Sequence, residues 1–184
     1  MTFWIRNATN KDVVAVTELV KEVYDEYGFA WDPAGYHADL YDLELHYWRA
    51  GHGFWVAETI EDNRIIGTVG AHFFEMLPPG DPPLAEHAGV LRVAGCDCAL
   101  ERLYVDPACR GAGVGTTLIE HVIAIAQSAG KRRMEIWSDK KLENAHRLYE
   151  KLGATIVGER LCNDPDQSPE WGLVLPLRAA ITID

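Results

Sequence analysis

Positive charge is scarce in this chain, which carries 17 Lys and Arg residues against 28 Asp and Glu, for a formal net charge of −11. Proteins that bind nucleic acids need basic patches that neutralise phosphates, so we expect no nucleic acid among the partners. Long apolar runs are missing as well, since no stretch approaches the ~18 apolar residues of a membrane span. The N-terminal stretch MTFWIRNATNKD lacks the basic and apolar segments of a secretory signal peptide. We therefore expect a cytoplasmic protein with no membrane partner.

The cysteines lack the spacing of a metal site. They are Cys96, Cys98, Cys109 and Cys162. Cys96 and Cys98 would share one face of a strand, but zinc takes four ligands and no second Cys/His pair has metal spacing. We expect reduced thiols in or near a strand, and no bound metal. Cys109 directly precedes Arg110, whose charge could make the thiol reactive; an inert turn residue is the simpler interpretation.

Apolar residues make up 48% of the 184 residues, enough for a sizeable core, and we expect one domain over residues 1–184. The patterns predict a strand at 3–6, then a helix that Thr9 and Asp12 cap and Gly28 ends. The apolar stripe of this helix is Val16, Leu19, Val20, Val23, Tyr24 and Tyr27. A hairpin of strands 54–58 and 65–74 and a second helix over about 34–48, closing at Gly51, are also expected. The Pro-rich stretch 77–88 should be an irregular loop. Further strands are expected at 94–105, 134–138, 154–158 and 171–177.

A glycine-rich loop, Arg110-Gly111-Ala112-Gly113-Val114-Gly115, lies between a strand that ends near Val105 and a helix expected to begin at about Thr116. Because glycine has no Cβ, successive backbone N–H groups can point into one concavity. The helix N-terminus behind the loop adds unpaired N–H groups and the positive end of the helix dipole. The pattern predicts an anion site, most naturally for a phosphate or pyrophosphate.

Three ligands compete for this loop. A Walker loop ends in Gly-Lys-Ser/Thr, and Gly115-Thr116-Thr117 has no lysine, which argues against ATP or GTP. A dinucleotide fold has G-x-G-x-x-G directly after a strand, whereas here the spacing is G-x-G-x-G and five residues intervene. The third interpretation is a resemblance: Arg110-x-x-Gly113-x-Gly115 resembles the Arg/Gln-x-x-Gly-x-Gly/Ala motif of the GNAT superfamily of N-acetyltransferases. In that family the loop holds the pyrophosphate of acetyl-CoA.

A second segment strengthens the resemblance. Asn144 to Gly153 is typical of a short helix with Ala145, Leu148, Tyr149 and Leu152 on one side, and it is similar to the family's later signature of an asparagine, a tyrosine and a glycine. The resemblance is firm over residues 100–154. It implies an α/β (α+β) fold of three layers, with a mixed, mostly antiparallel central sheet flanked by helices.

The resemblance also implies a co-substrate and the residues that hold it. Acetyl-CoA would bind through the glycine loop, the backbone N–H groups of the preceding strand would polarise the acetyl carbonyl, and Asn144 would contact the pantetheine arm. The residues so implied are Leu103, Tyr104, Val105, Arg110, Gly111, Ala112, Gly113, Val114, Gly115, Thr116 and Asn144.

Amide formation from a thioester needs an acid and a base. An aliphatic amine with a pKa near 10.4 is neutral in only roughly one molecule per few thousand at pH 7, and only the neutral form attacks. Tyr149 matches the family tyrosine near the CoA sulfur, where its hydroxyl would protonate the leaving thiolate; a tyrosine packed on the core is the alternative. Glu101, nine residues before Arg110, is the best candidate for the base and should alternate with Leu103 and Val105 on one strand face.

Other interpretations of these positions stay open. Glu101 could instead pair with Arg102, Arg92 or another cation. Asp97 is a second candidate base, and His72 and His146 could titrate near neutrality. In the family, the region of the helix expected over 34–48 borders the acceptor pocket. We therefore expect that the acceptor is contacted by Phe29, Trp31, Asp32 and Asp39.

Two functions of different classes follow. The first is an acetyl-CoA-dependent N-acetyltransferase that transfers the acetyl group directly to a primary amine of a small molecule or peptide. The second is a catalytically silent acyl-CoA-binding sensor on the same fold. Homodimers are common in the family, but the sequence leaves the oligomeric state open, and the acceptor amine is not identified by any motif.

Overall fold

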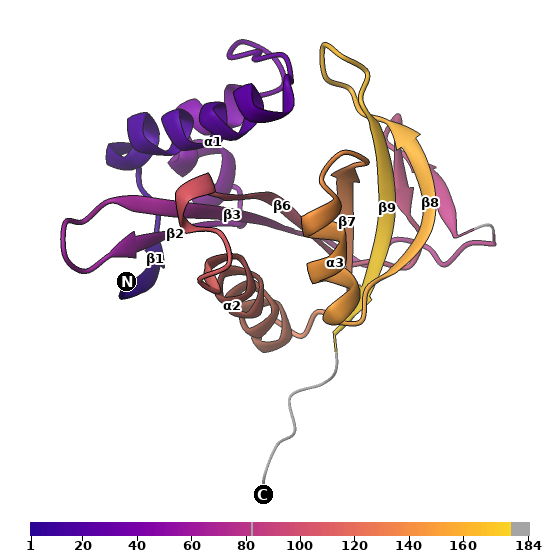
Figure 1. Ribbon diagram of the computed structural model, residues 1–184. Coiled ribbons are helices and arrows are strands. Elements are labelled where there is room, and N and C mark those ends of the chain that lie inside the picture. The colour runs from indigo at the N-terminus through magenta and orange to yellow at the C-terminus, as the bar shows by residue number, and fades with distance from the viewer. Residues whose placement is uncertain (82, 178–184) are drawn as a thin grey trace, which may run out of the picture. The chain divides into compact units, whose positions relative to one another are not determined.

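The computed structural model describes residues 1–81 and 83–177 (Figure 1). In chain order its main elements are β1 (Phe3–Asn7), α1 (Val13–Tyr27), β2 (Gly53–Thr59), β3 (Ile65–Phe73), β4 (Leu84–His87), β5 (Val90–Val93), β6 (Cys98–Val105), α2 (Val114–Ser128), β7 (Arg133–Asp139), α3 (Glu143–Lys151), β8 (Thr155–Leu161) and β9 (Pro169–Pro176). Seven strands form one sheet in the order β1-β2-β3-β6-β7-β9-β8, and β4 pairs with β5. The β6–β7 pair is parallel, and the pairs β1–β2, β2–β3, β7–β9 and β8–β9 are antiparallel. The expected mixed, mostly antiparallel sheet flanked by helices is confirmed.

Two compact units make up the chain. Of the described residues, the first unit comprises 1–72, 101–122 and 163–167, and the second comprises 73–100, 123–162 and 168–177. A single domain over 1–184 stays a prediction. Within the described ranges, no helix combines the length and the apolar character needed to cross a membrane.

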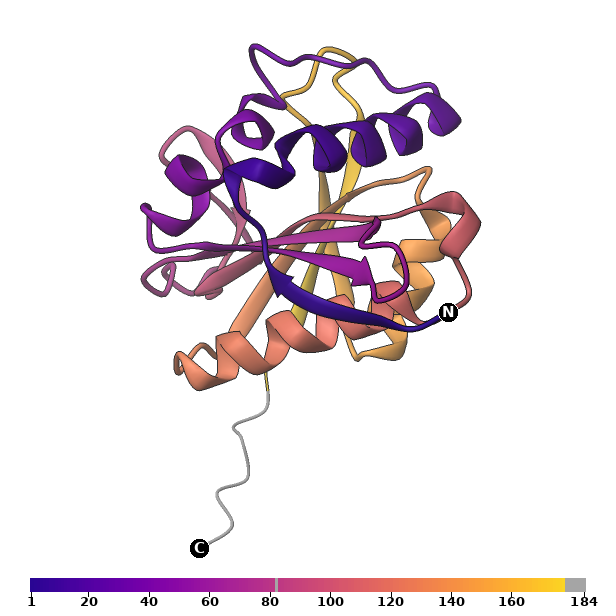
Figure 2. The same cartoon turned by 90° about the vertical axis from the view of Figure 1, so that its left-hand side faces the viewer.

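In the first unit, α1 covers one face of strands β1–β3 and the first turns of α2 cover the other (Figure 2). The predicted stripe of α1 is confirmed except at Tyr27, which is partly exposed; the buried residues are Val16, Leu19, Val20, Val23 and Tyr24. Gly28 ends the helix with φ 68°, a left-handed conformation that glycine adopts without steric cost. Thr9 and Asp12 form the expected capping box, although a short 3-10 turn (Asn10–Asp12) comes before α1.

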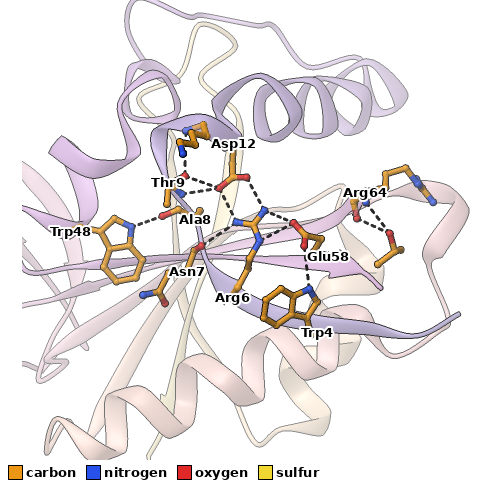
Figure 3. A network of polar contacts seen from close by, with 11 residues as sticks. Trp4, Arg6, Asn7, Ala8, Thr9, Asp12, Trp48, Glu58 and Arg64 are labelled. Carbon is orange, nitrogen blue, oxygen red and sulfur yellow. Dashed lines mark hydrogen bonds and ion pairs between the residues drawn. The ribbon is translucent and has the colours of Figure 1, made fainter. Parts of the chain in front are cut away.

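A network around Arg6 joins β1, β2 and the start of α1 (Figure 3). Arg6 Nη1 donates to Asp12 Oδ2 at 2.9 Å, and Arg6 Nε donates to Glu58 Oε2 at 2.8 Å. Trp4 Nε1 donates to the other Glu58 oxygen at 3.2 Å. Because Glu58 is only 7% exposed, these bonds satisfy a buried carboxylate. The strand edge and the helix start are thus held by charge-assisted hydrogen bonds.

The continuous helix expected over 34–48 is wrong. The structure has two short pieces instead, a 3-10 helix (Ala38–Tyr41) and a π-helix (Glu44–Trp48). Asp32 accepts hydrogen bonds from the backbone N–H groups of Gly35 and Tyr36, both at 3.0 Å, and Asp42 Oδ1 accepts from Leu45 N at 3.0 Å. Aspartate side chains that bond nearby backbone N–H groups compete with helical bonding, and this breaks the segment into turns.

The second unit corrects the prediction for residues 77–88. Leu84–His87 forms β4, which pairs antiparallel with β5 across a two-residue turn. The turn residues Ala88 and Gly89 both have positive φ, 52° and 78°, as a type I′ turn requires. The strand begins directly after Pro83, so each of its residues has a backbone N–H group. Position 82 lies outside the described residues. The stretch before it is irregular, as expected.

Strand β6 begins at Cys98, four residues later than expected. Ala94 and Gly95 form a turn, in which Gly95 has φ 71°. Asp97 lies in the bend before the strand and is 5% exposed. Its carboxylate accepts from the backbone N–H groups of Arg132 at 2.9 Å and Arg133 at 3.0 Å, so Asp97 fastens β6 to the start of β7. As a candidate base it is wrong, because both oxygens serve the fold.

Candidate functional site

The glycine loop leads directly into α2. Asp106 Oδ1 accepts from Ala108 N at 2.7 Å and caps a 3-10 turn, Pro107–Cys109. Gly111 and Gly113 then take φ values of 78° and 85°, and α2 begins at Val114, two residues earlier than expected. A Cβ on Gly67 of β3 would approach Val114 and Leu118 to 2.9 Å. The close approach of β3 fixes this helix start, whose first N–H groups have no partner within the helix.

Arg110 is held by α1. Its Nη1 and Nη2 atoms donate to the two carboxylate oxygens of Glu26, each at 2.7 Å. The Arg110 hydrogen bond keeps the pKa of Glu26 below its ordinary value. Both side chains reach solvent, with 31% of Arg110 and 40% of Glu26 exposed. The end of α1 therefore positions the cation beside the loop, and an incoming anion would compete with Glu26 for it.

The backbone of β6 departs from the expected alternation. Arg102 has φ 51°, a left-handed conformation inside the strand, and Thr68 Oγ1 donates to its carbonyl at 2.8 Å. Positive φ at a non-glycine residue is uncommon and typical of a bulge next to a functional site. The prediction that Glu101, Leu103 and Val105 simply share one face is therefore wrong.

Arg102 pairs with Asp39, not with Glu101. Arg102 Nε and Nη2 donate to the two oxygens of Asp39 at 3.0 and 2.7 Å, and Tyr47 Oη donates to Asp39 Oδ2 at 2.6 Å. Burial opposes the charge of Arg102, but Asp39 and the hydroxyls of Tyr36, Tyr104 and Tyr47 raise its pKa well above the usual range. The alternative pairing of Glu101 with Arg102 or Arg92 is wrong, because Arg92 pairs with Glu135.

Glu101 instead contacts His72. His72 Nδ1 lies 3.1 Å from Glu101 Oε1, and about a third of each side chain is exposed. The ring centroid of His52 lies 4.3 Å from that of His72, and Tyr47 lies 5.4 Å from it on another side. The structure thus gathers a carboxylate and two imidazoles in one cluster. His52 gave no sequence signal, because it lies outside every motif and periodic stripe.

The predicted acceptor residues lie around Tyr24 and His37. Phe29 and Trp31 contact the Tyr24 ring edge-on at 5.3 and 5.6 Å, and Trp31 stacks on His37 at 4.0 Å. His37 is fully buried, its Nδ1 accepts from Asp32 N at 3.2 Å, and burial lowers its pKa to about 4. Phe29 and Trp31 stay predictions as acceptor contacts. The other two predicted acceptor contacts have partners within the protein. Asp32 accepts from nearby backbone N–H groups, and Asp39 pairs with Arg102.

The predicted acid Tyr149 and the predicted pantetheine contact Asn144 belong to the second unit and lie on α3. Tyr149 is 5% exposed on the buried side of the helix, as the pattern predicted. Asn144 is exposed, and Arg147 Nη1 donates to its Oδ1 at 3.4 Å. His146 is buried, its Nε2 lies 3.1 Å from Ser138 Oγ, and burial lowers its pKa. His146 is therefore a structural residue rather than a base.

All four cysteines are buried. Burial raises the pKa of the Cys96 thiol to about 12 and raises that of Cys98 further. Cys109 is 4% exposed, and Arg64 Nη2 lies 3.5 Å from its sulfur. Among the described residues, no group of three or more His, Cys, Asp and Glu is arranged to hold a metal.

Comparison with known sequences decides the family. The model of the GNAT acetyltransferase family matches residues 16–154, which include the glycine loop, β6 and α3. The chain belongs to this family. The uncharacterized N-acetyltransferase MJ1207 of Methanocaldococcus jannaschii is 27% identical over 164 residues, which are 83% of this chain and 60% of that relative. This GNAT chain thus spans about three-fifths of that archaeal protein.

Solved structures agree with the GNAT fold. A GNAT-family acetyltransferase from Staphylococcus aureus superposes with a TM-score of 0.74 at 17% identity, covering 96% of this chain and all of the other. A putative acetyltransferase from Salmonella typhimurium, yncA, solved with acetyl-CoA, has a TM-score of 0.69 at 18% identity and covers 100% and 99%. At these identities the likeness establishes the fold.

Proposed function

We propose that this GNAT protein transfers the acetyl group of acetyl-CoA directly to a primary amine of a small molecule or peptide. The observation that carries the proposal is the glycine loop, which leads into the start of α2 with Arg110 held beside it by Glu26. A helix start combined with positive-φ glycines and a cation suits a pyrophosphate. Acetyl-CoA in the structure of the Salmonella relative supports this choice of ligand.

The co-substrate residues follow from the same proposal. The loop from Arg110 to Thr116 binds the pyrophosphate, Asn144 contacts the pantetheine arm, and N–H groups among Leu103, Tyr104 and Val105 polarise the acetyl carbonyl. The left-handed residue Arg102 precedes these three residues, and such a bulge re-aims backbone groups beside a site. Polarised in this way, the carbonyl carbon is open to attack by a neutral amine.

Proton balance assigns the remaining roles. The substrate ammonium loses one proton to become a nucleophile and a second after its nitrogen bonds to the acetyl carbon. The C–S bond then breaks, its electron pair leaves on sulfur, and Tyr149 protonates that sulfur and recovers a proton from water. One proton is released in all. We assign Glu101 as the group that accepts protons from nitrogen, because it is a carboxylate in contact with a titratable imidazole.

A ligand series tests the proposal. We expect acetyl-CoA and CoA, each at about 100 times its dissociation constant, to stabilise the protein by roughly 2.7 kcal/mol, a shift of several degrees in a thermal melt. NAD, NADP and ATP should produce no comparable shift. An amine screen that detects released thiol then follows. Binding of CoA without release of thiol from acetyl-CoA, whichever amine is added, would favour the acyl-CoA sensor. Stabilisation by NAD or ATP alone would contradict both functions.

Glu26 gives a second, more specific prediction. A Glu26→Gln variant removes a negative charge that competes with the cofactor for Arg110. Exposed ion pairs contribute about 0.2–1 kcal/mol, so we expect the dissociation constant for acetyl-CoA to fall by up to about fivefold. Calorimetric titration at low and high salt measures it, and the gain should shrink as salt screens the charges. Weaker binding by the variant would show that Glu26 supports the anion site rather than competing with it.

A further inference from the structure

Two imidazoles and one carboxylate meet in the first unit from three separate elements. His72 comes from the end of β3, Glu101 from β6, and His52 from the turn before β2. His72 is in the middle, with Nδ1 3.1 Å from Glu101 Oε1 and its ring 4.3 Å from the ring of His52 at an interplanar angle of 32°. The contacts therefore run from carboxylate to imidazole to imidazole.

The cluster has a buried wall and an open side. Tyr47, which is fully buried, lies 5.4 Å from the His72 ring, and its carbonyl accepts from His52 N at 2.7 Å. The side chains of His72 and Glu101 are 34% and 37% exposed, and His52 is partly exposed. A proton taken up by Glu101 or His72 can therefore leave to water without a change in the backbone.

The groups that face His72 include one carboxylate and one further imidazole. Three elements supply the groups that face it: Glu101 from β6, His52 from the turn, and Tyr47 from the π-helix. The Tyr47 hydroxyl donates to Asp39, whose charge Arg102 neutralises. Burial and the neighbouring His72 lower the pKa of His52, while Glu101 opposes this.

The base must act twice in each turnover. Two protons leave the nitrogen in each turnover, and Glu101 can hold only one. A carboxylic acid that has kept the first proton no longer accepts the second. The imidazole of His72, in contact with Glu101, can take the first proton, and direct loss to water competes with this route.

We propose that His72 is a proton-relay residue: it takes the first proton from Glu101, passes it to water, and so restores Glu101 as the base for the second proton. His52 adds a second imidazole beside it. The relay rests on the proposed acetyl transfer. No other reactant is needed: the Glu101 oxygen passes its proton to the unprotonated Nδ1 of a neutral His72, the ring releases the proton on Nε2 to water, and exchange of ring protons with water restores the first tautomer.

A His72→Asn variant separates relay from support. The asparagine amide can occupy the position of Nδ1 and hydrogen-bond to Glu101 in either protonation state of the carboxyl group, but it cannot take up a proton. We expect kcat/KM for the acceptor amine to fall by roughly 10- to 100-fold, at or below the usual range for general acid–base catalysis, with acetyl-CoA binding unchanged. The variant should also become faster as imidazole buffer is added at constant pH and ionic strength, because external base then clears Glu101.

The matched control is His46→Asn, at an exposed histidine on the π-helix beside Tyr47. It should keep both the rate and its indifference to buffer. A His72→Asn variant with wild-type rate and no buffer dependence would overturn the relay, since holding Glu101 would then suffice. If the wild-type protein releases no thiol with any amine, the proposed function fails instead.

An NMR titration tests the cluster without an acceptor. In a Glu101→Gln variant the pKa of His52 should fall further, because the carboxylate that opposes its lowering is lost. In His72→Asn the pKa of His52 should rise, because a neighbour that lowers it is removed. An unchanged His52 titration in both variants would overturn the cluster on which the relay depends.

Discussion

Replacing Asp39 by asparagine is expected to lower the free energy of unfolding by about 2–4 kcal/mol, because it leaves the Arg102 guanidinium buried without its counter-charge. The Arg102 side chain is 9% exposed and that of Asp39 20%. The variant also weakens the bond from Tyr47, whose hydroxyl donates to the same carboxylate. Urea denaturation at pH 7 measures the loss.

Two further variants make the Asp39 prediction specific. Glu26→Gln removes a bidentate Arg–Glu pair that is far more exposed, and it should cost about 1 kcal/mol or less. In a double variant with Arg102→Met the buried charge is gone, so part of the lost stability should return. Equal losses from Asp39→Asn and Glu26→Gln would contradict the conclusion that burial decides the energy of the pair.

A Tyr149→Phe variant is expected to reduce kcat by about 100-fold or more, the usual contribution of a general acid, while the KM for acetyl-CoA changes little. Phenylalanine keeps the packing of this 5% exposed ring but cannot protonate the departing thiolate. Initial rates of thiol release, at saturating acetyl-CoA, measure the effect.

The leaving group supplies the control for Tyr149. An acetyl thioester of a more acidic thiol needs less protonation as its C–S bond breaks, so the variant should lose much less activity on it. Tyr27→Phe, on α1, should leave kcat unchanged. A Tyr149→Phe enzyme with normal kcat would remove the acid role and leave Tyr149 as a packing residue.

Patterns set by backbone geometry or by a single motif could be predicted from the sequence. The period of α1, its ending at Gly28, the hairpin of β2 and β3, and the short helix ending at Gly153 all depend on local rules, and the structure confirms them. The anion site at the glycine loop could be predicted because it depends on the residues of the loop itself. Even so, α2 starts two residues early, because packing of Val114 and Leu118 against Gly67 extends it toward the loop.

What the sequence could not supply is the choice among partners. From the sequence, Glu101 could act as the base or pair with Arg102, Arg92 or another cation, and the fold paired it with His72 because β3 and β6 are neighbours in the sheet. The broken helix at 34–48 follows from Asp32 and Asp42 bonding to nearby backbone, which competes with a good apolar pattern. His37 and His52 belong to no motif, and only the tertiary structure brings them into aromatic and titratable clusters.

Because all four thiols are buried, their reactivity in an assay reports the fraction of the protein that is unfolded. A chromogenic disulfide that reports CoA should react with the solvent-exposed thiol of the product and hardly at all with the folded chain, because thiolates react and burial suppresses them at Cys96 and Cys98. Unfolded molecules would instead consume four equivalents at once. The same reagent therefore reads turnover as a slope and the unfolded fraction of the preparation as an initial burst.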